Sequence, residues 1–292
     1  MNLHLQSSVL NKISEIAVTG SKSETNRLLL LQALYPNITL ENVSKSDDSE
    51  VMTKALSSNV QPTTQIVDIH HAGTAMRFLT AYFSVQDGRE VILTGSPRMK
   101  ERPIKILVEA LKQLGAEISY EENEGFPPIK IKGKKLSNNK VSLLANTSSQ
   151  YISALLLIAP KLENGLELTL EGEITSVPYI KMTLALLNEI GVETSFEGNI
   201  IKVNQKSAIV NQQSTIESDW SSASYFYSLV ALSEVGTQIT ISSYKQNSLQ
   251  GDSVLAEIYK HFGVQTTFQG NKIVIAKTEN SSQESLNFNH KN

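Results

Sequence analysis

The chain has 292 residues, a net charge of −3 at pH 7 and no cysteine, with 40% hydrophobic and 19% charged residues. This composition is typical of a globular protein with room for two domains, and without a basic block it argues against general nucleic-acid binding. The missing cysteines exclude disulfides, thiolate metal ligands and thiol nucleophiles. Every apolar run is too short to span a bilayer, so we expect a cytoplasmic protein with no membrane segment, and we expect it to be a monomer.

The predicted elements repeat one order along the chain. Residues 21–34 are predicted to form a helix, followed by a strand at 37–43 and a second helix. The same succession of helix, strand and polar loop starts again at residues 71, 146 and 218. The sequence therefore contains four copies of one unit, and the first copy is shorter than the others.

Each later copy ends in an amphipathic helix, a glycine and an alternating stretch. These segments are 106–120, 182–196 and 253–268, with the glycines Gly115, Gly191 and Gly263. A glycine between a helical period and a period-two pattern predicts that the helix stops and a strand follows. The full unit is therefore helix, strand, helix, strand, strand, and we predict an α/β (α+β) fold built from such repeats.

Polar and basic side chains gather at the starts of the four leading helices. Capping explains any one start, because Ser, Thr, Asp and Asn are the preferred N-caps, and we expect the Ser and Thr residues of 21–25 to cap the first helix. Four starts on one side of a repeated fold would also form an anion site, since each carries free N–H groups and a partial positive charge. The side chains that add to this site are Lys22 and Arg27 at the first start, Arg77 at the second, Ser148, Ser149 and Gln150 at the third, and Arg98, Lys100 and Arg102 in a loop.

Other chemistries fit these motifs poorly. Gly-Ser-Lys-Ser is not a P-loop, because Ser21 precedes Lys22 in place of a glycine and Ile16 occupies the position of the first required glycine. His70 and His71 are adjacent and have no carboxylate pattern beside them, so we expect no metal site. Asp47 and Asp48 are expected to cap the helix that starts near Glu50.

Several motifs, taken in order, resemble a known family. They are "GSKSETNR", "HAGTAMRF", "LTGSPRMKERP", "TSSQY", "TSVPYI", and "SDWSSASY" followed by "NSLQGD". From residue 10 onward the chain resembles the 5-enolpyruvylshikimate-3-phosphate synthases, or 3-phosphoshikimate 1-carboxyvinyltransferases. The resemblance implies transfer of the enolpyruvyl group of phosphoenolpyruvate to the 5-hydroxyl of shikimate 3-phosphate, with release of phosphate, on the pathway to chorismate and the aromatic amino acids. It implies no metal or organic cofactor.

The resemblance also implies an architecture. The family folds six βαβαββ units into two halves, an inside-out barrel arrangement with the active site in the cleft between them. Four units would be present here: three in a complete half at 20–217, and one, with an N-terminal strand, in an incomplete half at 1–19 plus 218–292. The family continues past the last motif into its acid–base carboxylate and two further units, so we expect a C-terminally truncated chain with negligible turnover.

The resemblance assigns the site residue by residue. Lys22, Ser23 and Arg27 match positions that contact shikimate 3-phosphate, and Lys22, the expected catalytic residue, also reaches phosphoenolpyruvate. Gly73 with Thr74, and Arg98, match positions that bind phosphoenolpyruvate. The remaining matches contact shikimate 3-phosphate: Ser148, Ser149, Gln150, Ser176 and Tyr179.

Three positions depart from the family's pattern. His71 stands where Asn is usual, Phe78 where Pro is common, and Val177 where Lys is frequent. His71 can donate a hydrogen bond as Asn does, so it is kept among the predicted substrate-binding residues. Two alternatives stay open: a non-catalytic protein that binds shikimate 3-phosphate or another anion, and the related UDP-N-acetylglucosamine enolpyruvyl transferase, which usually carries a loop cysteine.

Overall fold

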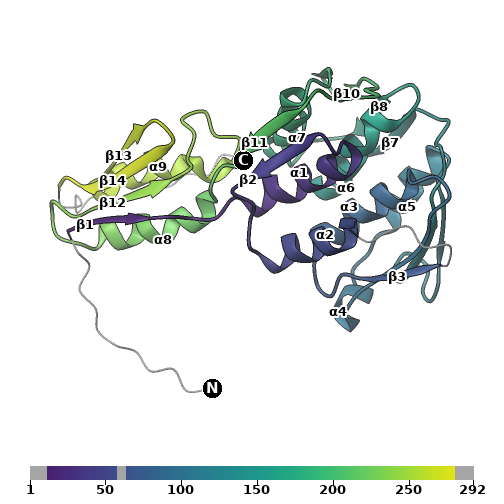
Figure 1. Cartoon of the computed structure of the whole chain (residues 1–292), viewed down its shortest axis with the longest axis horizontal. Coiled ribbons are helices and arrows are strands. Elements are labelled where there is room, and N and C mark those ends of the chain that lie inside the picture. Colours follow the sequence, from purple (N-terminus) through teal and green to yellow (C-terminus); the bar gives the residue numbers. More distant parts are fainter. Residues whose placement is uncertain (1–11, 58–63, 280–292) are drawn as a thin grey trace. The chain divides into compact units, whose positions relative to one another are not determined.

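The computed structural model describes residues 12–57 and 64–279, and the chain falls into two compact units. One unit is Ser21–Ile216, and the other combines Met1–Gly20 with Glu217–Asn292. The polypeptide therefore passes from one unit to the other after Gly20 and again after Ile216. Figure 1 shows the course of the chain, coloured along its sequence.

The unit Ser21–Ile216 alternates helices and strands. Its elements are α1 (Lys22–Leu34), β2 (Ile38–Glu41), α2 (Asp47–Ser57), β3 (Gln65–Asp68), α3 (Gly73–Ser84), β4 (Glu90–Thr94), α4 (Pro97–Lys100), α5 (Lys105–Gln113), β5 (Glu117–Tyr120), β6 (Ile129–Lys132), β7 (Lys140–Leu144), α6 (Ser149–Ile158), β8 (Leu166–Glu171), α7 (Val177–Glu189), β9 (Thr194–Glu197), β10 (Ile200–Val203) and β11 (Gln212–Thr215). A short 3₁₀ helix, Ala159–Lys161, continues α6.

Two four-stranded sheets of this unit share one strand order. The orders are β3-β4-β6-β5 and β7-β8-β10-β9, in which the first two strands are parallel and the other neighbours antiparallel. A parallel pair needs a crossover connection, and α3 and α6 supply it in the two sheets. Strand β2 of the first copy instead belongs to a two-stranded sheet, in which it is parallel to β11.

The other unit contains one sheet of the same kind. Its elements are β1 (Ile13–Ile16), α8 (Trp220–Ala231), β12 (Gln238–Ser242), α9 (Leu255–Ile258), β13 (Val264–Gln269) and β14 (Lys272–Lys277), and the strand order is β1-β12-β14-β13. Strand β1 precedes α1 in the chain but pairs with β12, whereas β11 precedes α8 but pairs with β2. The two units have thus exchanged their first strands.

Helices α3 and α6 form the interior of the unit Ser21–Ile216. Nearly every residue of both helices is buried, as expected for helices that are apolar on most sides. Helix α3 packs against α1 and α6, and α6 packs against α7. The strands β4 and β8 alternate buried and less buried residues, so one face of each sheet is buried in the unit and the other is more exposed.

The three glycines that were predicted to stop helices do so. Gly115, Gly191 and Gly263 each follow a helical segment and have φ values of 101°, 81° and 71°. This left-handed region is reached without steric cost only by glycine. The strands β5, β9 and β13 then begin within a few residues, as the alternating patterns predict.

The prediction of one regular helix before Gly263 is wrong. The segment consists of a 3₁₀ turn (Gly251–Val254), the single α-helical turn α9 and a second 3₁₀ turn (Tyr259–Phe262). None of these residues is fully buried, and helices of this length depend on tertiary packing for their stability. Among the described residues, no helix combines the length and apolarity needed to cross a bilayer.

Candidate functional site

Arg27 joins the N-terminal parts of three helices. Its guanidinium donates to Thr183 Oγ1 of α7 at 2.8 Å, to Ser153 Oγ of α6 at 3.0 Å and to the carbonyl oxygen of Ser23 at 2.7 Å. Arg27, Ser153 and Thr183 each lie within the first two turns of their own helix. The N-terminal ends of α1, α6 and α7 therefore lie together, and α3 joins them through Phe78, whose ring lies 5.5 Å from the guanidinium.

The same contacts bury the charge of Arg27. The residue is 3% exposed, and this burial lowers the pKa of Arg27 to about 10, although Tyr179 and Glu24 act in the opposite direction. The Tyr179 ring centroid lies 5.9 Å from the guanidinium carbon. Arg27 thus supplies positive charge beneath the helix starts, and it leaves little of its own surface within reach of a ligand.

The starts of α1 and α3 have no side-chain caps, which corrects the expectation that Ser and Thr residues cap the first helix. At the N-cap positions Ser21 and Ala72, no side chain accepts a hydrogen bond from the helix. Thr25 is occupied elsewhere, because its hydroxyl accepts the backbone N–H of Ser44 at 3.0 Å. The first-turn N–H groups of both helices are therefore not satisfied by caps, as an anion site requires.

The starts of α6 and α8 are capped. Ser148 accepts the N–H of Gln150 at 3.3 Å, and at α8 Asp219 accepts the N–H of Ser222 at 3.0 Å. Gln250 also accepts the N–H of Trp220 at the start of α8, at 3.0 Å. Helix α8 belongs to the other unit, so the helix starts that lie together within one unit are those of α1, α3, α6 and α7, and the last of these was not predicted.

The expected caps of α2 are also wrong in detail. The helix begins at Asp47, and the hydroxyl of Ser46 accepts the N–H of Ser49 at 3.4 Å. Asp47 and Asp48 lie in the first turn instead, where a carboxylate is stabilised by the helix dipole. The polar residues of this segment therefore have a local structural role.

The predicted site residues differ in their exposure. Exposed residues are Lys22, His71, Arg98, Ser148 and Tyr179; half-buried ones are Ser23, Thr74, Ser149, Gln150 and Ser176; Gly73 is buried. Gln150 Nε2 donates to Thr74 Oγ1 at 3.4 Å, which links the starts of α3 and α6. The backbone of Ser96, the cap of α4, donates to the carbonyl oxygen of His70 at 2.8 Å, so the helical turn that carries Arg98 lies beside the turn that leads into α3.

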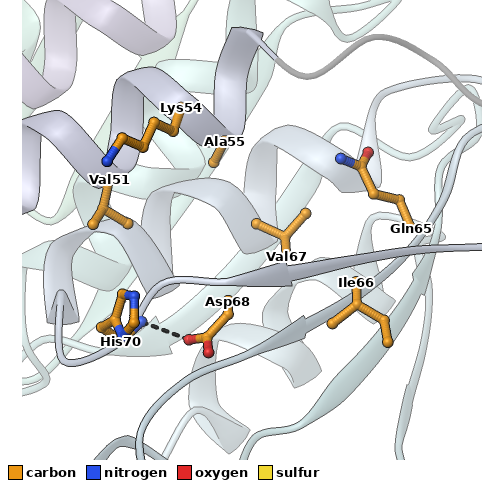
Figure 2. A pocket seen from close by; sticks show the side chains of 8 residues that line it. All are labelled: Val51, Lys54, Ala55, Gln65, Ile66, Val67, Asp68 and His70. Atoms are coloured by element: carbon orange, nitrogen blue, oxygen red, sulfur yellow. Dashed lines mark hydrogen bonds between the residues drawn. The ribbon is translucent and has the colours of Figure 1, made fainter.

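Two hollows lie beside the start of α3. The first, of about 220 Å³, is drawn in Figure 2 between α2 and β3, and Asp68 on its wall accepts the backbone N–H of His70 at 2.7 Å. None of the predicted site residues lines it. His71 lines the second hollow, of about 320 Å³, together with Asp47 and Glu50. In the described part of the chain, no group of three or more His, Asp or Glu side chains could hold a metal ion.

Sequence reasoning missed the residues that organise the site. Ser153 and Thr183, the hydrogen-bond partners of Arg27, are single polar residues in apolar helix segments, and this interruption is the signal that could have found them. Arg102 was noted in its loop but given no role. Its guanidinium lies against Gly73, because a Cβ added there would be 2.3 Å from Arg102 Nη1.

Known proteins resemble this chain along most of its length. The family model of EPSP synthase (3-phosphoshikimate 1-carboxyvinyltransferase) matches residues 57–290. A 3-phosphoshikimate 1-carboxyvinyltransferase of Bacteroides fragilis strain YCH46 is 45% identical over 269 residues, which cover 90% of this chain and 63% of that protein. The protein of the same name from Actinobacillus pleuropneumoniae serotype 5b is 36% identical over 304 residues, covering 94% of this chain and 69% of that protein.

The fold is shared with solved structures. An EPSP synthase from Acinetobacter baumannii superposes with a TM-score of 0.72 at 19% sequence identity, over 91% of this chain and 64% of that one. This likeness confirms the predicted α/β architecture. The chain spans 63% of the length of the Bacteroides relative. The match of the family model and the identity to these relatives confirm the resemblance read from the motifs: the chain belongs to the EPSP synthase (3-phosphoshikimate 1-carboxyvinyltransferase) family.

Proposed function

We propose that this chain serves the transfer of the enolpyruvyl group from phosphoenolpyruvate to the 5-hydroxyl of shikimate 3-phosphate, with release of phosphate. In this proposal the unit Ser21–Ile216 binds shikimate 3-phosphate. The observation that carries it is the group of helix starts around Arg27, three of which, those of α1, α3 and α7, have no side-chain caps. Family membership supplies the identity of the anions.

The charges of the unit support a site for polyanions. Seven ion pairs join described residues of this unit, and the cation in each of these pairs is a lysine. The exposed side chains of Lys22 and Arg98 form no ion pair or hydrogen bond with a described residue, so their charge is available to a ligand. Cations that are not already paired bind an added phosphate or carboxylate most strongly.

The proposed roles follow the placement of the side chains. Lys22, at the first position of α1, neutralises charge on both substrates and stabilises charge that develops as phosphate leaves. Ser148, Ser149 and Gln150 at the start of α6, with Ser23, Ser176 and Tyr179, hold shikimate 3-phosphate. Gly73, Thr74 and Arg98 hold phosphoenolpyruvate, and His71 donates a hydrogen bond beside them. Arg27 is buried and contributes indirectly, because its hydrogen bonds fix the positions of the helix starts.

Titration calorimetry with shikimate 3-phosphate tests the binding part of this proposal. We expect saturable binding that is lost in Lys22→Ala and kept in Lys54→Ala, which removes an exposed lysine from α2. Shikimate, which lacks the phosphate, should bind far more weakly. Binding of UDP-N-acetylglucosamine in its place would favour the sister transferase, and the absence of shikimate 3-phosphate binding would contradict the proposal.

A coupled phosphate-release assay tests the chemical part. With both substrates present, the assay separates enolpyruvyl transfer from binding alone, because only the reaction releases phosphate from phosphoenolpyruvate. Steady phosphate release by the 292-residue chain would contradict the prediction of negligible turnover. Binding of shikimate 3-phosphate without any release would agree with that prediction and with a non-catalytic binding protein.

A further inference from the structure

A third hollow lies at the opposite ends of the helices that form the candidate site. Its volume is about 320 Å³, and its lining includes Val85, the C-cap of α3, and Lys161, the last residue of the 3₁₀ helix that continues α6. Because α3 has 12 residues, its two ends are about 18 Å apart. The hollow is therefore separate from the helix starts around Arg27.

Backbone hydrogen bonds fix the two segments that form its walls. In the loop after β6, the N–H of Lys134 donates to the carbonyl oxygen of Ser84 in α3 at 3.2 Å. In the 3₁₀ helix after α6, the carbonyl oxygen of Pro160 accepts the N–H of Lys206 at 2.9 Å. Both walls are thus tied to neighbouring elements, so the hollow is formed before any ligand binds.

Part of the lining is apolar. Val85, Leu136 and Leu162 line the hollow, and the two leucines are only 4% and 2% exposed. A ligand that consisted of charge alone would gain nothing from these side chains. A ligand with an apolar part would gain from covering them, because burying apolar surface is favourable.

The charged part of the lining is mostly positive. Lys134, Lys135 and Lys161 line the hollow together with one carboxylate, Glu163, and all four side chains are exposed. Within the described ranges, none of the four forms an ion pair or a side-chain hydrogen bond. The charge of Lys134 lowers the pKa of Glu117 slightly, but that carboxylate is already paired with another lysine at 2.9 Å. Positive charge therefore remains to be compensated at the hollow.

The ammonium group of Lys161 has a fixed place. Its Nζ lies 3.9 Å from the centroid of the Tyr35 ring, and Tyr35 is itself held, because its hydroxyl donates to the carbonyl oxygen of Lys206 at 2.6 Å. Partial burial lowers the pKa of Lys161. An anion beside a partly desolvated ammonium group replaces interactions that water no longer supplies.

The helix dipole explains some of these lysines but not their arrangement. A cation is favourable at the C-terminal end of a helix, which accounts for Lys134 beside the end of α3 and Lys161 at the end of α6. It accounts neither for Lys135 nor for three lysines around one partly apolar hollow. We propose that this hollow binds a small organic anion, a carboxylate or phosphate on an apolar body, with Lys134, Lys135 and Lys161 as its charge partners.

Limited acetylation of lysines tests the proposal residue by residue on the full chain. Mass spectrometry of the digested protein gives the rate of acetylation at each lysine, with and without a probe. Phenyl phosphate and benzoate are the main probes, since each carries an anion on an apolar ring. Inorganic phosphate and acetate carry the anion alone, and benzyl alcohol carries the ring alone. Lys112, which is exposed and already paired with Glu109 at 3.5 Å, is the matched control.

We expect phenyl phosphate or benzoate to slow the acetylation of Lys134, Lys135 and Lys161 in a saturable way, while the rate at Lys112 stays unchanged. The better of these two probes identifies the anionic group that the hollow prefers. Inorganic phosphate and acetate should bind at least about threefold more weakly, because they gain no apolar contact. Benzyl alcohol should give no protection.

Two substitutions that change the charge in opposite directions sharpen the test. Lys161→Gln removes a positive charge and should weaken binding of the better probe, measured at Lys134 and Lys135, by at least about threefold. Lys161→Arg keeps the charge and should retain most of the affinity. Glu163→Gln removes the carboxylate that lines the hollow, so it should strengthen binding by about twofold.

Four results would overturn the proposal. They are no protection by either organic anion, equal protection of Lys112, unaltered affinity in Lys161→Gln, and inorganic phosphate that binds as tightly as phenyl phosphate. Lys22 reports separately on the helix starts in the same experiment. Protection of Lys22 by shikimate 3-phosphate therefore tests the proposed function independently of what the hollow binds.

Discussion

The guanidinium of Arg27 is a buried cation whose three hydrogen bonds end on neutral oxygens. Removing a charge from water is costly unless its partners compensate, and the lowered pKa of Arg27 reflects that cost. The contacts with Ser153 and Thr183 nevertheless bring three helix starts to one place. We infer that Arg27 is a positioning residue, in addition to the substrate contact that the family resemblance predicts.

Arg27→Ala is expected to lower the free energy of unfolding of the unit Ser21–Ile216 by about 3 kcal/mol, because it leaves a cavity and removes three hydrogen bonds from a charged donor. Urea denaturation followed by far-UV circular dichroism measures the change. Arg98→Ala is the control, since an exposed arginine without partners should change the stability by no more than about 0.5 kcal/mol. Equal stability of the two variants would show that Arg27 does not hold the helices together.

The sequence predicted which residues carry charge at the site better than it predicted how deeply each of them is buried. The motif identified Lys22 and Arg27 together, yet the structure leaves Lys22 exposed and buries Arg27. The difference depends on Ser153 and Thr183, which are 126 and 156 residues away in the chain. Local patterns carry no information about such distant partners, so both Arg27's hydrogen bonds and the position of Arg102 required the folded structure.

At the scale of the elements, one carboxylate joins three neighbouring strands. Glu167 of β8 lies 3.0 Å from Lys140 Nζ of β7 and 3.3 Å from Lys202 Nζ of β10. Hydrogen bonds from Lys140 and Lys202 hold the pKa of Glu167 below its ordinary value. A carboxyl group with a lowered pKa stabilises the folded state above its ordinary pKa, and this stabilisation is lost as the pH falls through its folded value.

The difference in stability between the unaltered protein and Glu167→Gln should therefore depend on pH. We expect the unaltered protein to be the more stable near neutral pH, and the difference to disappear once the pH is below the lowered pKa of Glu167. Urea titrations of both proteins from pH 7 down to pH 3 measure it. A difference that stays constant over this range would mean that the two lysines do not act through the charge of Glu167.

Elements with a strong local signal were predicted well. The glycines Gly115, Gly191 and Gly263 end helical segments because glycine adopts their left-handed backbone conformation without steric cost. The segment before Gly263 has the apolar spacing of a helix. Its 3₁₀ turns contain no fully buried residue, so tertiary packing does not stabilise a regular helix there. The missing side-chain cap at α1 has a similar cause. The hydroxyl of Thr25 accepts the backbone N–H of Ser44, a contact that the spacing of residues in the sequence does not reveal.

At the scale of the whole molecule, one of the two units has a fluorescence reporter of its own. The single tryptophan, Trp220, is fully buried in the core of the unit that contains α8, against Tyr227 and Tyr244. Its indole N–H donates to the buried carboxylate of Glu217 at 2.8 Å, which also accepts the hydroxyl of Ser248 at 2.7 Å. Tryptophan fluorescence therefore reports on this unit alone.

Substitutions in the two units should consequently be distinguishable. Glu217→Gln replaces an acceptor with an amide that cannot accept all of these hydrogen bonds, so it should move the fluorescence transition to a lower urea concentration. Arg27→Ala should leave that transition unchanged while moving the transition seen by circular dichroism. If both substitutions move both transitions equally, the two units unfold as one.

The central claim is that the helix starts around Arg27 form the site of an anionic substrate. A crystal structure of the chain grown with shikimate 3-phosphate tests it most directly. The account predicts the phosphate within hydrogen-bond distance of Ser148, Ser149 or Gln150, with the ammonium group of Lys22 beside the same ligand. A ligand seated in the hollow of Figure 2, beside Asp68 and His70 and away from these side chains, would contradict it.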